Sequence, residues 1–200
     1  MALAHQYQYA EKEHYTEDEY FEFERTSFGR WEYVKGEIRA MSGGTADHNT
    51  ISSNLVGTLR AALLPKGCRV FGSDMKVHTP VDVNTLPDVS VVCGPLGFHR
   101  GRKDIITNPI LIVEVLSDST EGYDQGDKFR HYQTIPTLTD YLLVAQDEAR
   151  IQLYTRHDDH WHYQNISGLD RTIHLPSVET TLALPDIYAL IDLGADEAGA

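Results

Sequence analysis

Three segments between Pro87 and Lys128 decide the fold: Pro87-Asp-Val-Ser-Val-Val92, Ile110-Leu-Ile-Val-Glu-Val-Leu-Ser117 and Asp127-Lys128. The second segment is an apolar, largely β-branched run without polar alternation, which is typical of a strand buried on both faces. Glu114 near its end is costly to bury unless a cation or several hydrogen bonds meet it. Asp88 opens the preceding strand in the same way. If the two strands are neighbours, two carboxylates converge near Lys128, as a divalent cation and a phosphodiester would require.

The chain of 200 residues is long enough for one domain with a substantial core. We expect a disordered tail at 1–14, a single domain at 15–192 and an acidic tail at 193–200. No apolar run approaches the roughly 20 residues of a membrane span, and the N-terminus lacks a signal-peptide hydrophobic region. We therefore expect a cytoplasmic protein without a membrane partner. Cys68 and Cys93 are expected to be small buried apolar residues rather than a disulfide framework.

The formal charge of −13 argues against broad non-specific DNA binding, which depends on a basic surface. It does not exclude a nuclease, because metal-binding acids add negative charge and a local basic groove can coexist with an acidic exterior. The most basic loop contains Arg100, Arg102 and Lys103, which are candidates for gripping a phosphate backbone. The histidines between His157 and His160 lie in a predicted hairpin turn, where we expect them to be exposed.

The remaining pattern predicts one α/β or α+β domain without internal repeats. The predicted elements are, in order, a capped helix at 16–23, a hairpin at 31–41, a helix at 51–63, one long or bent strand at 69–78, a turn at 80–85, a strand at 88–92, a polar connection at 94–108, a strand at 110–116, a helix at 123–134, a strand at 141–144, a hairpin at 151–164, a strand at 172–175 and a short helix at 185–190.

Five phrases in the chain together resemble the Uma2 family of the PD-(D/E)XK, restriction-endonuclease-like superfamily. They are Trp31-Glu-Tyr-Val-Lys-Gly-Glu37, Val70-Phe-Gly-Ser-Asp-Met75, Pro87-Asp-Val-Ser-Val-Val92, Asn108-Pro-Ile-Leu-Ile-Val-Glu-Val-Leu-Ser117 and Asp127-Lys128. The resemblance covers about residues 16–190. It implies a restriction-endonuclease-like core, in which helices flank a central mixed sheet of about four strands, with added N- and C-terminal β-hairpins.

The same resemblance implies an active site. Asp88 matches the aspartate of the superfamily motif and Glu114 matches its second acid. Two residues after Glu114, where the motif has lysine, this chain has Leu116. Some superfamily members supply the lysine from the following helix, and Lys128 is placed for that role.

Three further residues match positions of the Uma2 family: Glu37 in the N-terminal hairpin, His48 early in the first long helix, and Tyr132 one helical turn after Lys128. Glu37 and His48 either support the first metal or bind a second one. The implied ligands of Mg²⁺ or Mn²⁺ are the carboxylates of Asp88 and Glu114 and the carbonyl of Val115.

The leading interpretation is a Mg²⁺-dependent nuclease that hydrolyses nucleic acid, with DNA ahead of RNA and a homodimer as the implied assembly. The first alternative is a catalytically inactive nuclease fold that binds nucleic acid or protein, which Leu116 and the acidic charge favour. The second is an interaction protein whose aromatic hairpins, containing Trp31, Tyr33, Trp161 and Tyr163, form a dimer surface. Metal binding and turnover distinguish these three interpretations.

Overall fold

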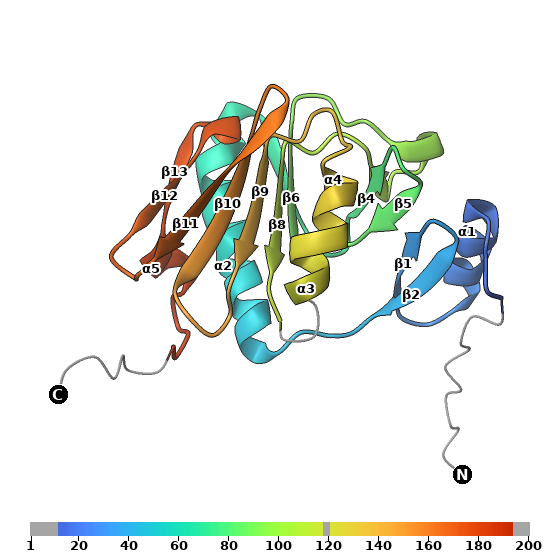
Figure 1. Cartoon of the computed structure of the whole chain (residues 1–200), viewed down its shortest axis with the longest axis horizontal. Coiled ribbons are helices and arrows are strands. Elements are labelled where there is room, and N and C mark those ends of the chain that lie inside the picture. The colour runs from blue at the N-terminus through green and yellow to red at the C-terminus, as the bar shows by residue number, and fades with distance from the viewer. Residues whose placement is uncertain (1–11, 118–120, 194–200) are drawn as a thin grey trace, which may run out of the picture.

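The computed structural model describes residues 12–117 and 121–193. Within them, a six-stranded mixed sheet in the order β11-β10-β9-β8-β6-β3 forms the centre of the fold (Figure 1). Its strands are β3 (Cys68–Gly72), β6 (Val89–Cys93), β8 (Leu111–Val115), β9 (Asp140–Val144), β10 (Arg150–His157) and β11 (His160–Ser167). The pair β8–β9 is parallel, and the other pairs are antiparallel. The predicted restriction-endonuclease-like mixed sheet is confirmed, with six strands where about four were expected.

One face of this sheet is covered by α2 (Ala46–Leu63), which lies behind it in Figure 1. Thr45 caps α2, and the apolar stripe Ile51, Leu55, Leu59 and Leu63 is fully buried. The stripe joins a core cluster with alternate residues of β6 and β8, such as Val91 and Val113. The helical period of the sequence thus placed this helix correctly.

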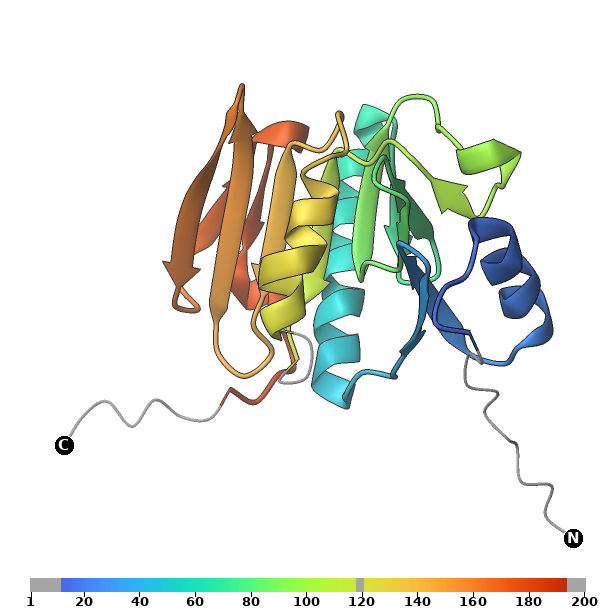
Figure 2. The same ribbon diagram turned by 45° about the vertical axis from the view of Figure 1, so that its right-hand side comes forward.

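The opposite face is covered by a helical segment made of α3 (Glu121–Tyr123), the π-helical η3 (Asp124–Lys128) and α4 (Phe129–Tyr132). This segment connects β8 to its parallel neighbour β9, a geometry that requires a crossover (Figure 2). Phe129 and Tyr132 pack there with Ile112 and Leu116 of the sheet face. Since side chains alternate along β8, Glu114 points to this same face, toward the crossover segment.

A second sheet, in the order β2-β1-β5-β4-β7, lies beside the central one. Its strands are β1 (Arg30–Val34), β2 (Glu37–Met41), β4 (Lys76–Thr79), β5 (Val83–Thr85) and β7 (Ile105–Ile106). The helix α1 (Glu17–Thr26) packs on it through Tyr20, and Thr16 and Glu19 form the predicted capping box. The predicted N-terminal hairpin therefore exists, as part of a larger sheet.

The remaining elements extend the ends of these layers. They are the 3₁₀ turns η1 (Leu64–Lys66), η2 (His99–Gly101) and η4 (Pro176–Val178), the strand pair β12 (Thr172–Leu175) and β13 (Thr180–Ala183), and the short helix α5 (Leu184–Ile187). The predicted tails at 1–14 and 193–200 lie outside the described residues, apart from positions 12–14 and 193. Among the described helices, none has the length and apolar character that crossing a membrane requires.

Two expectations about the middle of the chain were wrong. Residues 69–78 are not one strand, because a turn at Ser73 and Asp74 divides them between β3 of the central sheet and β4 of the second sheet. Residues 80–85 are not all turn, since Val83–Thr85 forms β5. The turn itself is shorter and contains Asp82 at a φ of 61°, a left-handed conformation that aspartate tolerates.

The two cysteines were also misjudged, because Cys68 and Cys93 form a disulfide. They are register partners at one end of the β3–β6 pair, with their Cα atoms 4.0 Å apart. Directly opposed positions in an antiparallel pair bring two Cβ atoms together. The register of two strands, which the spacing of the cysteines in the chain does not specify, creates this pair.

Candidate active site

A cavity of about 210 Å³ lies between the end of β8, the start of β6, the first turns of α2 and the crossover segment. Its lining includes Asp88, Glu114, Val115, Lys128 and His48, all of which the sequence analysis singled out, together with these further residues: Arg30, Met41, Ser42, Gly43, Gly44, Thr45, Asn49, Ser52, Ser73, Leu86, Ser117 and Asp124. Residues distant in the sequence therefore meet at one place.

Lys128 lies at the centre of a buried charge network behind this cavity. Its Nζ atom is 2.9 Å from Oε1 of Glu114, 3.4 Å from Oδ1 of Asp124 and 3.6 Å from Oε1 of Glu32. The Lys128 side chain is only 4% exposed. Although burial alone would lower the pKa of Lys128, the carboxylates of Glu114, Glu32 and Asp124 raise it well above its ordinary value. Lys128 therefore stays an ammonium group.

Glu114 has a second partner in this network besides Lys128. It accepts a 2.8 Å hydrogen bond from the hydroxyl of Tyr132, which in turn lies 2.8 Å from the hydroxyl of Thr85. Burial raises the pKa of Glu114 well above the ordinary range; Lys128 opposes the rise, and the nearby Asp124 and Asp88 add to it. The site thus holds more negative charge than Lys128 alone offsets.

Asp88 is fixed at the start of β6 by two contacts. Its Oδ2 accepts a 2.8 Å hydrogen bond from the backbone N–H of Val115 and lies 3.3 Å from Nε2 of His48. His48 belongs to the first turn of α2, which explains how a helix on the other face reaches the cavity. The hydrogen bond to Asp88 raises the pKa of His48, burial opposes the rise, and a hydrogen bond to the Val115 backbone supports it.

Glu37 is the one predicted site residue that the structure separates from the others. It is paired with Arg39 at the surface, where its Oε2 accepts a 2.6 Å hydrogen bond. Glu32 on the paired strand β1 is buried instead and accepts a 2.9 Å hydrogen bond from the Leu86 N–H, beside Lys128. The acid of the hairpin that reaches the network is therefore Glu32, and Glu37 is not part of it.

The two arginines of the basic loop contact other residues of the protein. Arg100 pairs with Glu17 and Asp18 of α1, and Arg102 pairs with Asp104 and lies over the ring of Phe21. These contacts use the two guanidinium groups to hold α1 in place. They give no support to a role in gripping a phosphate backbone.

The aromatic hairpins offer less surface than the interaction hypothesis needs. Trp31 and Tyr33 are buried against α1, and Trp161 packs edge-on against Phe129. Tyr163 remains 48% exposed. The N-terminal half of the expected dimer surface is thus part of the core. The histidines of the β10–β11 turn are exposed, as predicted.

The donor set at the cavity fits a hard divalent cation. Asp88, Glu114 and the Val115 backbone line the same space, and carboxylate and carbonyl oxygens are the ligands that Mg²⁺ and Mn²⁺ prefer. Burial is the main cause of the raised pKa of Glu114, and Asp124 and Asp88 add to it; a bound cation would favour the ionised form of Glu114. A volume of about 210 Å³ also leaves room for waters, each of which occupies about 30 Å³ in the liquid.

Comparison with known proteins agrees with this architecture. The family Uma2, described as "Putative restriction endonuclease", matches residues 17–185. The chain belongs to the Uma2 family. "Uncharacterized protein slr1290" of Synechocystis sp. is 43% identical over 176 residues, covering 86% of this chain and 90% of the relative. A second Synechocystis relative, "Uncharacterized protein sll1609", is 34% identical over 145 residues, covering 72% and 82% of the two chains.

A solved structure supports the Uma2 fold independently. It is described as a "putative nuclease belonging to DUF820" from Anabaena variabilis and superposes with a TM-score of 0.66. The match covers 79% of this Uma2 chain and 89% of that chain, at 19% sequence identity. At that identity the likeness establishes the restriction-endonuclease-like fold, and the residues of the cavity have to be argued from their own geometry.

Proposed function

We propose that this Uma2 protein is a Mg²⁺-dependent nuclease that hydrolyses phosphodiester bonds of nucleic acid, with DNA as the preferred substrate. The main support is the convergence of Asp88, Glu114 and Lys128 on one cavity, from two strands and the crossover segment between β8 and β9. Membership of a family described as "Putative restriction endonuclease" supports the same reaction class.

Asp88, Glu114 and the carbonyl of Val115 would hold the metal. When bound, the ion would polarise the scissile phosphate and lower the pKa of a water molecule. The protein fixes both carboxylates beforehand: Asp88 accepts from the Val115 N–H, and Glu114 accepts from the Tyr132 hydroxyl. Such preorganisation avoids an ordering cost at the moment of reaction.

Lys128 would replace the lysine of the superfamily motif, although it lies on the crossover segment and not on β8. The motif position, Leu116, is 4% exposed and packs with Phe129, the neighbour of Lys128, so that its side chain completes the core. The ammonium of Lys128 meets Glu114 at 2.9 Å from the crossover segment. There it holds the carboxylate in position and offsets charge that develops on the phosphate.

The substrate phosphate has two recognition groups at the cavity. The first turn of α2, with Thr45, His48 and Asn49, opens on it, and the N-terminus of a long helix favours an anion. Arg30 lines the same cavity and adds a fixed positive charge. These groups supply local positive potential on a chain whose formal charge is −13.

A second candidate is a nuclease fold that binds nucleic acid without turnover. The observation that favours it is the burial of Lys128 among three carboxylates, with its side chain only 4% exposed. Three carboxylates hold the ammonium of Lys128, so it would have to leave at least one of them to orient a water in the cavity.

A cleavage assay separates the two candidates. Supercoiled plasmid, single-stranded DNA and single-stranded RNA are incubated with the protein and no metal, Mg²⁺ or Mn²⁺. Asp88→Asn keeps an oxygen that can accept from Val115, so it tests the metal ligand without removing the structural contact. The control is Asp147→Asn, at an exposed loop position.

Metal-dependent cleavage by the wild type and by Asp147→Asn, lost by at least about 100-fold in Asp88→Asn, is the expected result. Cleavage retained by Asp88→Asn would contradict the assignment of Asp88 as a metal ligand of the nuclease site. Absence of cleavage, together with Mn²⁺ binding that depends on Asp88, would favour the binding candidate.

A further inference from the structure

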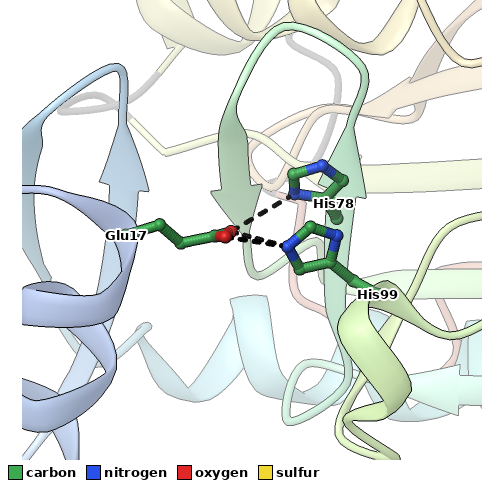
Figure 3. A group of neighbouring side chains, drawn as sticks. All are labelled: Glu17, His78 and His99. Atoms are coloured by element: carbon green, nitrogen blue, oxygen red, sulfur yellow. Dashed lines mark hydrogen bonds and ion pairs between the residues drawn. The ribbon is translucent and has the colours of Figure 1, made fainter.

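A group of side chains of the types that bind metals lies beside the second sheet, which contains β4. Glu17 of α1, His78 of β4 and His99 of η2 place one donor atom each within 4.8 Å of one another (Figure 3). All three residues are half-buried. None of them lines the cavity that holds Asp88 and Glu114. The cluster is therefore separate from the nuclease site.

The donor atoms point to a common position. Oε1 of Glu17 lies 2.8 Å from Nε2 of His99 and 3.7 Å from Nδ1 of His78. Figure 3 shows both ring nitrogens facing the carboxylate from the same side. Ligands bound tetrahedrally at 2.0–2.1 Å from Zn²⁺ lie about 3.3 Å from each other. The two separations bracket that value, and rotation of the two stacked rings away from each other would complete the geometry.

The two imidazole rings stack on each other beside Glu17. Their centroids are 3.5 Å apart and their planes are inclined by 19°. Two protonated rings at that separation would repel each other. At least one ring is thus a neutral imidazole, the form that binds metals.

Neighbouring groups orient the cluster as ligating residues are usually oriented. The buried Asn84 donates a 2.9 Å hydrogen bond to Oε1 of Glu17, and its Oδ1 lies 2.8 Å from Nδ1 of His78. Arg100 donates to Oε2 of Glu17, the oxygen away from Asn84.

We propose that Glu17, His78 and His99 form a structural binding site for a transition-metal ion of the Zn²⁺ class. Two imidazole nitrogens and one carboxylate oxygen suit Zn²⁺ and its neighbours far better than Mg²⁺. Binding requires Nδ1 of His78 and Nε2 of His99 to give up the protons that face Asn84 Oδ1 and Glu17. Each proton moves to the other nitrogen of its ring or, from a doubly protonated ring, is released to solvent, which frees both nitrogens as ligands. A water molecule or Oδ1 of Asn84 supplies the fourth ligand.

The ion would fasten three separate parts of the chain. Glu17 lies in the first turn of α1, His78 lies on a strand of the second sheet, and His99 lies in the connection between β6 and β7. In the metal-free arrangement, hydrogen bonds and ion pairs hold these parts together. A bound ion replaces them with stronger bonds and stabilises the folded state by linkage.

The test is calorimetric titration of the full chain with Zn²⁺, and with Co²⁺ followed by visible absorption. All proteins in this test carry Asp88→Asn, which removes a proposed Mg²⁺ ligand, so that binding at the nuclease site does not contribute. We expect one equivalent to bind and to raise the melting temperature by several degrees. His78→Gln/His99→Gln should weaken binding by at least about 100-fold and abolish the increase in melting temperature. Glutamine retains hydrogen-bonding capacity toward Glu17, which protects the fold.

The histidines of the β10–β11 turn provide the matched control. His157, His160 and His162 lie near one another at the surface, with ring centroids 5.9 and 6.1 Å apart around His157. Replacing all three with glutamine should leave Zn²⁺ affinity unchanged. The proposal is overturned if His78→Gln/His99→Gln, shown by circular dichroism to be folded, binds Zn²⁺ like the wild type, or if binding is lost only in the control. Neither result depends on nuclease activity.

Discussion

The Nζ atom of Lys128 lies 2.9 Å from Oε1 of Glu114, although the lysine belongs to the π-helical turn of the crossover and the glutamate to β8. Each side chain is 4% exposed. In the proposed active site, Lys128 would replace the lysine of the superfamily motif, because Leu116 at the motif position packs in the core. The Lys128–Glu114 pair also couples stability to the proposed activity, because the same contact serves both.

Replacing Lys128 with methionine should therefore affect both properties. Three carboxylates would lose their cation, and breaking a buried ion pair costs about 3 kcal/mol of unfolding free energy. Urea denaturation would measure that loss, and plasmid cleavage should fall by at least about 100-fold. Arg60→Met, at an exposed position of α2 outside the cavity, is the control and should change neither. A variant with intact cleavage would show that Lys128 has only a structural role.

The convergence of Asp88, Glu114 and Lys128 on one cavity could be predicted from the sequence because the relevant signals are local. A carboxylate at the end of an apolar run, as at Glu114, is costly enough to require a partner. Asp88 before the adjacent run and the helical pattern around Lys128 supplied the other two groups. The strand pairing β6–β8 and the crossover then bring them together.

The residues that were missed, or wrongly assigned, depend on how separate sheets meet. Glu32 and Glu37 belong to the same hairpin, and no local pattern says which one faces Lys128. Asp124 lies one helical turn before Lys128 and could have been found from that spacing. The Cys68–Cys93 pair and the division of residues 69–78 between two sheets both follow from strand register, which is a tertiary property.

The capping box of α1 should make stability depend on pH in the acid range. Hydrogen bonds from the Lys12 ammonium and the Thr16 N–H lower the pKa of Glu19 from 4.5 to about 2. A carboxyl group whose pKa is lower in the folded state stabilises the fold above its unfolded pKa. That stabilisation is full above about pH 4.5 and is lost as the pH falls toward about 2.

Glu19→Gln should accordingly be less stable than the wild type at pH 7, with the difference shrinking between pH 4.5 and pH 3. Thermal melting at several pH values would measure it. Asp147→Asn, at an exposed loop position, should show no comparable trend. A constant difference across this range would mean that the amide replaces the carboxylate fully and that the charge has no role.

The disulfide between Cys68 and Cys93 should stabilise the central sheet. It closes a loop with a sequence separation of 25, and cross-links over loops of this order contribute about 3 kcal/mol. Cys68→Ser/Cys93→Ser should lower the urea midpoint by a corresponding amount and make it insensitive to reductant. Two free thiols titrated in the native protein without reductant would contradict the pairing.

The two acids of the N-terminal hairpin allow a matched test of the proposed site. Glu32 accepts a hydrogen bond from the Leu86 N–H and lies beside Lys128, so Glu32→Ala leaves a buried donor unsatisfied at a cost of about 1–3 kcal/mol. It should also reduce cleavage at least about 10-fold, because Lys128 loses one of its partners. Glu37→Ala removes only an exposed pair with Arg39 and should change unfolding free energy by less than about 0.5 kcal/mol. Urea denaturation and plasmid cleavage of the two variants, measured side by side, test this prediction. A larger effect of Glu37→Ala would show that Glu37, and not Glu32, belongs to the site.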